Sequence, residues 1–400
     1  MRRALPLLVL ALSLLAAAAC GEEAERGHPE PGGSPDHAVR PHAAAWDEVS
    51  AAAEGQTVRW WMFGGDERIN RYVDEEVAPR AEQLGVTIER VPIDDTASAV
   101  QRVAAEFRAG ETEGGGGVDL IWINGENFAE GKEAGLWLED WATSLPNAEL
   151  VDWEDATVAE DFGVPVEGQE SPWSRAVFVF AYDEARTPEP PRTYEELATY
   201  AAENPGRITY PAPPDFTGGA FVRQVVQALG DDAAFELLAD MKPNQWREGR
   251  SFPTNEAELN QLFGNGEVDL AMSYDPSFVA SGVRQGTFPE TARPYTLESG
   301  ALQNVSYVTI PANAANREGA LVVANLLLDP ELQALKADPD RLGIPTVLDL
   351  ERLDPDQREL FSEPAGDSPY HLVDYGALLS ELSPSRVVQL EERWQEEVLR

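Results

Sequence analysis

The chain has 400 residues, 43% of them hydrophobic as is usual for a globular protein, but its 71 acidic residues outnumber 30 basic ones and give a formal net charge of −41. Because a phosphate backbone would be repelled, this excess argues against a nucleic-acid partner. The acidic residues are scattered, so two interpretations stay open: attraction of a cationic ligand, or, as we favour, a solubilising surface suited to salty surroundings. Cys20 is the only cysteine, which excludes disulfides, Cys-rich metal sites and thiol catalysis in the mature domain.

Residues 1–45 predict a targeting segment and a tether. Two arginines precede an apolar run too short to be a comfortable membrane span, and three alanines lead into Cys20. This arrangement resembles a bacterial lipobox. It implies a signal peptide over residues 1–19 and a lipid on Cys20, the alternative being an ordinary secretory peptide with a stray cysteine. Residues 20–45 lack large apolar side chains, so we expect a disordered tether. Its histidines are interpreted as solvated rather than as a metal site: His28, His37 and His42.

The rest of the chain, roughly 355 residues, exceeds the size at which one hydrophobic core keeps growing, so two lobes are expected. In its first part, strand-like and helix-like segments alternate in a β-α-β-α-β order, which predicts a parallel sheet. The helix expected after the first strand stops at Gly85. Ligands of such sheets lie beyond the carboxyl ends of the strands. Two of these ends are rich in aromatic and polar residues: Trp60–Asp66 and Trp122–Gly125.

The second part of the chain also alternates between strand-like and helix-like segments. The segment 173–183 predicts an aromatic strand, and Thr193 is placed to cap the helix that follows. Two further strand ends carry polar clusters that lead into helix N-termini, where free backbone N–H groups can receive a polar ligand. A strand, a loop and one long amphipathic helix are expected over residues 302–337. The two polar clusters comprise Tyr210 with residues 215–219, and residues 273–277.

Five segments in this order resemble an extracellular solute-binding protein of an ATP-binding-cassette importer, in the YnjB-like branch that is similar to thiamine- and polyamine-type binding proteins. They are "VRWWMFGGDERINRYVDEEV", "VDLIWINGENFAEGKEAGLWLEDW", the stretch from "FVFAYDEARTPEPP" to "PPDFTGGAFVRQ", "GEVDLAMSYDPS" and "IPANAANREGALVVANLLLDPELQ". The resemblance covers nearly all of residues 50–350 and depends on the order of the segments.

The resemblance implies an α/β, periplasmic-binding-protein-like fold of two doubly wound lobes joined by hinge strands, with one small molecule held in the cleft between them. A membrane permease and its ATPase would take delivery, and the lipid at Cys20 would hold the protein outside the cytoplasm, at the cell surface or in the periplasm. The expected N-terminal lobe comprises residues 46–168 with about 303–345. Residues 169–302 form the C-terminal lobe, and 346–400 an added helical segment.

By position, the resemblance also assigns the ligand-binding residues. No cofactor, metal site or catalytic residue is expected, and His371 is the only histidine outside the tether that a catalytic set could use. Aromatic faces would stack on a ring or attract a cation, carboxylates would neutralise a positive ligand, glycines would allow close backbone approach, and amides and hydroxyls would orient the ligand. The residues are Trp61, Phe63, Gly64, Gly65, Asp66, Asn124, Trp173, Tyr210, Thr217, Gly218, Tyr274, Asp275 and Ser277.

Alternatives stand beside these assignments. Trp60 and Trp61 alternate across a strand, so one is core, and we place Trp61 in the cleft. Asp66 is equally suited to capping a helix. Arg175 and Arg223 are interpreted as partners of local acids rather than of an anionic ligand. The residues favour a cationic or ring-bearing ligand such as thiamine, although sugars also stack on tryptophan. Two other classes remain open, a surface-anchored carbohydrate hydrolase using paired carboxylates and a passive adhesin.

Overall fold

The computed structural model describes residues 43–93, 95–338, 341–361, 368–372 and 374–400, and these residues belong to one compact unit. The expected signal peptide, Cys20 and nearly all of the expected tether lie outside the described residues. Helix α1 (Ala43–Ala53) begins three residues before the expected start of the N-terminal lobe at residue 46. Within the described parts of the chain, no helix is both long and apolar enough to cross a membrane.

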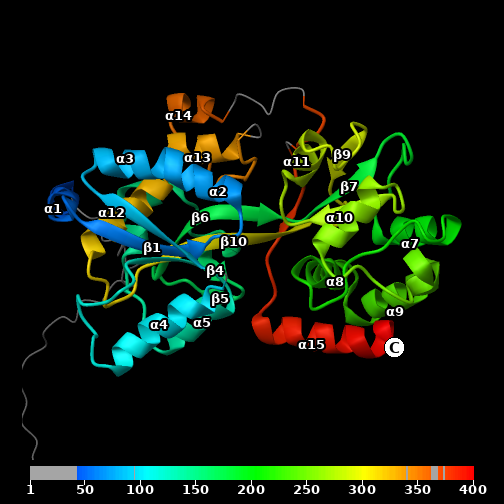
Figure 1. The fold of residues 1–400 in the computed structure, drawn as a ribbon, viewed down its shortest axis with the longest axis horizontal. Helices are drawn as coiled ribbons and strands as arrows, with labels where there is room; N and C mark the ends of the chain where they lie inside the picture. Colours follow the sequence, from blue (N-terminus) through cyan, green and yellow to red (C-terminus); the bar gives the residue numbers. More distant parts are fainter. Residues whose placement is uncertain (1–42, 94, 339–340, 362–367, 373) are drawn as a thin grey trace, which may run out of the picture. The chain divides into compact units, whose positions relative to one another are not determined.

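The described residues contain two large hydrophobic cores, which define two lobes (Figure 1). Lobe 1 is the body around the core drawn from residues 53–173 and 305–353, and lobe 2 the body around the core drawn from residues 177–302 and 390–398. The main sheet has the strand order β11-β10-β3-β1-β2, and β6 also pairs with β10. Its strands are β1 (Thr57–Phe63), β2 (Thr87–Ile93), β3 (Leu120–Ile123), β6 (Glu170–Val177), β10 (Ala301–Thr309) and β11 (Leu378–Leu379).

Strand β1 lies between β2 and β3 and is parallel to both, which confirms the parallel sheet predicted for this part of the chain. Side chains alternate along β1, so Trp60 is fully buried in the lobe 1 core, whereas Trp61 on the other face is only partly buried. Besides α1, the α-helices of lobe 1 are α2 (Glu67–Tyr72), α3 (Ala78–Gln83), α4 (Ala97–Arg108), α5 (Glu126–Glu133), α6 (Ala156–Ala159), α12 (Arg317–Leu327), α13 (Pro330–Ala337) and α14 (Pro355–Glu359).

Two of the expected long helices differ in detail. Residues 67–83 are helical without a break, as expected, but a π-helical turn, Val73–Val77, lies between α2 and α3, and Pro79 follows near the start of α3 without an N–H to donate to the preceding turn. The single long helix predicted near residues 317–337 is wrong, because it ends at Leu327 and a second helix begins at Pro330. Asp329 caps that second helix, since its carboxylate accepts from the amides of the first turn.

Lobe 2 has a three-stranded sheet in the order β8-β7-β9, with β7 antiparallel to both neighbours. Thr193 caps α7 through a hydrogen bond from the amide of Glu196, as predicted. The elements of lobe 2 are β7 (Val179–Asp183), β8 (Leu270–Ser273), β9 (Ala292–Tyr295), α7 (Tyr194–Glu203), α8 (Phe216–Leu229), α9 (Asp231–Met241), α10 (Glu256–Gly264), α11 (Phe278–Arg284) and α15 (Pro384–Trp394).

Two strands connect the lobes. β6 and β10 pair antiparallel from Val177 with Gln303 to Glu170 with Thr309, and they run from one group of elements to the other (Figure 1). A register shift between Ser306 and Tyr307 interrupts the ladder. This pair forms the hinge expected of a periplasmic-binding-protein-like fold, in which two lobes close by bending about a few shared strands.

The C-terminal segment divides between both lobes. Residues Val347, Leu348 and Leu353 belong to the lobe 1 core, whereas Leu390 and Trp394 on α15 are buried in the lobe 2 core. Between them, β11 pairs with the start of β10, the strand that connects the lobes. The segment is therefore built into both lobes, and its helices are short and separated.

Candidate functional site

A single arginine side chain, Arg68 on α2, connects the two lobes. Its guanidinium donates to Asp66 Oδ2 in lobe 1 at 3.0 Å and to Asp275 Oδ2 in lobe 2 at 2.8 Å. It also donates to the hydroxyls of Ser277 at 2.8 Å and Ser281 at 3.1 Å. Three residues predicted to bind the ligand, Asp66, Asp275 and Ser277, therefore meet around one cation that the sequence analysis did not select.

The carboxylates around Arg68 are held by local turns. Asp66 Oδ1 accepts from the backbone amides of Arg68 and Ile69, so Asp66 caps α2 while it also faces the junction of the lobes. Asp275 accepts from the amide and hydroxyl of Ser277. Burial works against charge at both acid and base here, yet the ion pairs prevail: the pKa of Asp66 is lowered by Arg68, and the pKa of Arg68 is raised by Asp275 and Asp66.

On the lobe 1 side, aromatic residues line the end of β1 and β3. The Phe63 side chain is 42% exposed, and its ring lies edge-on to Trp122 at 6.4 Å between centroids. Trp173 is almost fully buried against Trp60 and Trp122, so it faces the lobe 1 core. Trp61 packs partly against the same core. Phe63 is thus the most exposed of the aromatic residues that were assigned to the ligand.

The turn after β1 requires its two glycines. A Cβ on Gly65 would lie 2.3 Å from the Phe63 ring, and one on Gly64 would lie 2.7 Å from Pro92. A side chain at either position would therefore displace the aromatic end of β1 or its neighbour. Asn124, at the end of β3, is half-buried.

On the lobe 2 side, the predicted residues separate into a surface group and an interior group. Tyr210 is fully buried, its hydroxyl accepts from Trp394 Nε1 at 2.9 Å, and its ring faces the core rather than the junction. Thr217 donates to Glu256 at 2.6 Å. Gly218 lies against the backbone of Pro211, since an added Cβ would come within 2.0 Å of the Pro211 carbonyl oxygen.

Tyr274 is buried and contacts both an exposed aromatic residue and the C-terminal segment. Its ring lies 5.0 Å from that of Phe216, which is 53% exposed. Its hydroxyl donates to Glu381, and Arg223 holds both oxygens of the same carboxylate through two hydrogen bonds of 2.8 Å. Arg223 thus pairs with an acid of its own chain. Phe216 lies in the cluster of residues 215–219 that the sequence singled out but was not assigned to the ligand. Glu381 was not predicted, since nothing in the sequence linked residue 381 to residue 274.

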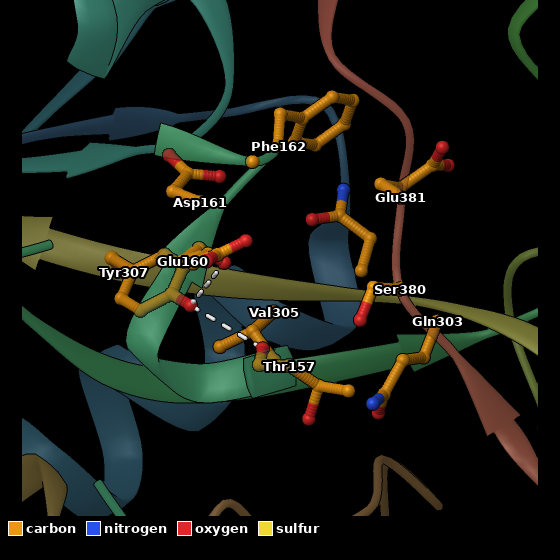
Figure 2. A pocket seen from close by; sticks show the side chains of 11 residues that line it. Thr157, Glu160, Asp161, Phe162, Gln303, Val305, Tyr307, Ser380 and Glu381 are labelled. Atoms are coloured by element: carbon orange, nitrogen blue, oxygen red, sulfur yellow. Dashed lines mark hydrogen bonds between the residues drawn. The ribbon is translucent and has the colours of Figure 1, made fainter. Parts of the chain in front are cut away.

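A small polar pocket lies where lobe 1, β10 and the C-terminal segment meet (Figure 2). The turn bearing Glu160, Asp161 and Phe162 runs along one side, and the segment bearing Ser380 and Glu381 along the other. Its cavity volume is about 20 Å³, room for one water-sized group such as an ammonium head. Burial raises the pKa of Asp161 to about 8. No group of three residues with histidine, cysteine or carboxylate side chains is placed to hold a metal ion anywhere in the described ranges.

Comparison with known proteins decides the family. Residues 77–356 match the family described as bacterial extracellular solute-binding proteins. The chain belongs to this family. Protein YnjB of Escherichia coli strain K12 is 39% identical over 372 residues, which cover 88% of this chain and 94% of YnjB. This similarity confirms the resemblance to the YnjB-like branch.

Two further similarities are narrower. A spermidine/putrescine-binding periplasmic protein of Salmonella typhimurium is 34% identical over 116 residues, covering 29% of this chain and 30% of that protein. The solved structure of the spermidine/putrescine ABC transporter substrate-binding protein PotD from Streptococcus pneumoniae has a TM-score of 0.60 at 14% identity, covering 86% of this chain and 99% of the other. At that identity, the similarity supports the fold alone, and it confirms the periplasmic-binding-protein-like architecture.

Members of this extracellular solute-binding family bind a small ligand and deliver it to an ABC permease. Family and fold are those of non-enzymatic binding proteins, so the carbohydrate-hydrolase alternative is not supported.

Proposed function

We propose that this solute-binding protein captures a cationic, amine- or ring-bearing solute between its lobes and delivers it to an ABC permease. The supporting observation is the convergence of Asp66 from lobe 1 and Asp275 from lobe 2 on one guanidinium. Arg68 stands where a diffusible cation would satisfy the same two carboxylates. Lobes that close around a cation bring both acids to it, whereas in an open protein each acid would face solvent.

Exposed aromatic rings on both lobes support the same class of solute. Phe63 in lobe 1 and Phe216 in lobe 2 are about half exposed although both are phenylalanines. An aromatic face attracts a cation or stacks on a ring, worth about 0.5–2 kcal/mol depending on desolvation. The similarity to the spermidine/putrescine-binding periplasmic protein of Salmonella typhimurium agrees with an amine.

A thermal-shift screen of the purified protein tests this proposal. Thiamine, putrescine, spermidine, neutral sugars and small anions would be added separately, and we expect a cation to raise the melting temperature. Asp275→Asn keeps the local turn but removes a charge, and should weaken that cation at least about tenfold, or about 1.4 kcal/mol. Asp47→Asn, an exposed acid on α1, is the matched control. Stabilisation by sugars or anions alone would refute a cationic solute.

We also propose that a lipid on Cys20 anchors the protein outside the cytoplasm, which the lipobox-like segment supports. A detergent phase-partition assay compares the wild type with Cys20→Ser. The wild-type protein should enter the detergent phase and the variant should remain in water. Equal partitioning of both would overturn the anchor.

A further inference from the structure

The hairpin between β4 (Glu160–Asp161) and β5 (Val164–Pro165) has an unusual turn. Both of its central residues have left-handed backbone, with φ of 47° at Phe162 and 76° at Gly163. Glycine accepts this conformation freely, and two-residue turns of this kind favour Asn or Asp before it. A phenylalanine there is strained. Backbone strain of this sort persists at positions where the side chain is needed in one place.

The strained turn holds the Phe162 ring at the edge of the pocket described above. The ring lies against Gly125, where an added Cβ would be 3.4 Å from it, and Phe162 is one of the pocket-lining residues (Figure 2). Its neighbour Asp161 lines the same pocket and is only 1% exposed. One turn therefore supplies an aromatic ring and a carboxyl to a single small space.

The Asp161 carboxyl has unused hydrogen-bonding capacity. Its Oδ2 accepts from the Gly125 amide at 2.5 Å, but its Oδ1 is buried and has no partner among the described residues. The Tyr307 hydroxyl donates to the carbonyl oxygen of Val158 at 3.0 Å instead. Gln303, 2% exposed on β10, likewise uses its Oε1 to accept from Arg175 and leaves Nε2 without a partner among those residues.

The pocket also lacks a balancing cation of its own. Three acids line it, Glu160, Asp161 and Glu381, and none of its lining residues is Lys or Arg. Glu381 is already paired with Arg223. Arg175 reaches Gln303 rather than an acid. The pocket thus borders a buried carboxyl group with one oxygen that has no partner among the described residues, beside an aromatic ring, and a buried charge of this kind needs a cation or a proton.

We propose that this pocket binds an organic ammonium group of the captured solute, with an N–H donating to Asp161 Oδ1 and the Phe162 ring facing the positive charge. This subsite shares no residue with the one formed by Asp66 and Asp275, and it rests on the proposed capture of a cationic solute.

Calorimetric titration of the purified protein with putrescine, and with 1,4-butanediol as its neutral isostere, tests the subsite. We expect putrescine to bind and butanediol not to bind. Asp161→Asn keeps an acceptor for the Gly125 amide and should weaken putrescine about tenfold or more, since charge-assisted hydrogen bonds are about twice as strong as neutral ones. Phe162→Gly should weaken it about threefold or more through loss of the cation–π contact. Asp47→Asn should bind as the wild type does.

Phe162→Gly separates binding from folding. Glycine relieves the left-handed strain, which offsets the entropy it adds to the unfolded chain and the lost packing of the ring, so this variant should melt close to the wild type while it binds more weakly. A purely structural turn would alter the melting temperature and leave the affinity unchanged. Should Asp161→Asn fail to fold, Phe162→Gly still tests whether the subsite binds the ammonium group. Wild-type affinity in both variants would overturn the subsite and leave the proposed function standing, whereas absence of binding by every cation in the thermal-shift screen would overturn the proposed function itself.

Discussion

Replacing Arg68 with glutamine should open the solute-free protein. Arg68 donates to Asp275, Ser277 and Ser281 across the junction of the lobes, and glutamine is too short and uncharged to keep these contacts. Its loss also leaves the carboxylates of Asp66 and Asp275 facing each other without a cation, so they repel. Both effects favour the open arrangement, in which each acid is hydrated.

The size of the effect follows from the exposure of the groups. The side chains of Arg68 and Asp275 are 31% and 29% exposed, so the ion pair is screened and contributes about 0.2–1 kcal/mol. Each hydrogen bond to a serine adds about 0.5–1.5 kcal/mol, and contacts that share one guanidinium add less than their sum. We expect a loss of about 1–2 kcal/mol, or about 5–30-fold in the closed-to-open ratio.

Small-angle X-ray scattering measures this change directly. The radius of gyration of R68Q without solute should exceed that of the wild type, and a saturating cationic solute should reduce it again by taking the place of the guanidinium. R71Q is the matched control, because Arg71 lies on the same helix and is exposed. If R68Q scattered like the wild type and R71Q, the Arg68 contacts would contribute nothing to closure, and their use as evidence for a cation site would be lost.

Three further predictions concern stability, each measured by urea denaturation. Glu381→Gln breaks a pair whose side chains are 3–4% exposed, so we expect a loss of about 3–5 kcal/mol, and a loss under 1 kcal/mol would show that Arg223 finds another partner. Trp394→Ala should cost about 3–5 kcal/mol because it empties a fully buried site beside Tyr210; an unchanged midpoint would mean that α15 is not part of lobe 2. Burial raises the pKa of Asp161 to about 8, so the folded protein holds a proton that the unfolded chain releases near pH 4. The unfolding free energy should therefore fall between pH 4 and 8, by at most about 1.4 kcal/mol per pH unit for this group, and less steeply in Asp161→Asn; parallel pH curves would refute the assignment.

Local sequence patterns predicted those features of the fold that depend only on neighbouring residues. Alternation along residues 57–63 placed Trp60 and Trp61 on opposite faces, and Thr193 was identified as a helix cap from its position alone. The break between α12 and α13 was predictable too, because the Asp329-Pro330 pair is a cap followed by a residue common at the first helical position. The apolar periodicity across that pair obscured it.

The site was predictable only in part, because its geometry depends on contacts between distant segments. The sequence placed Asp66 and Asp275 at the ends of strands, but nothing local showed that Arg68 would lie between them, 207 residues from Asp275. Tyr210 looked like a strand-end aromatic residue, yet it is buried because α15, at the end of the chain, packs over it with Trp394. The left-handed backbone of Phe162 could not be predicted either, since a Phe-Gly pair is not typical of a two-residue turn with left-handed backbone.

Because basic residues are few in this acidic chain, some buried acids such as Asp161 have no Lys or Arg beside them in their pocket. With 30 basic residues for 71 acidic ones, interior acids such as Glu381 take an arginine, but Asp161 has none in its pocket and remains buried. With a pKa of about 8, it is mostly protonated at pH 7 when no solute is bound. An ammonium group needs the carboxylate, so its binding should expel nearly one proton. Putrescine titrations at pH 7 should then give different heats in phosphate and in Tris, which differ in ionisation enthalpy, and Asp161→Asn should lose that difference. Equal heats for the wild type in both buffers would show that Asp161 keeps its proton and that the ammonium group binds elsewhere.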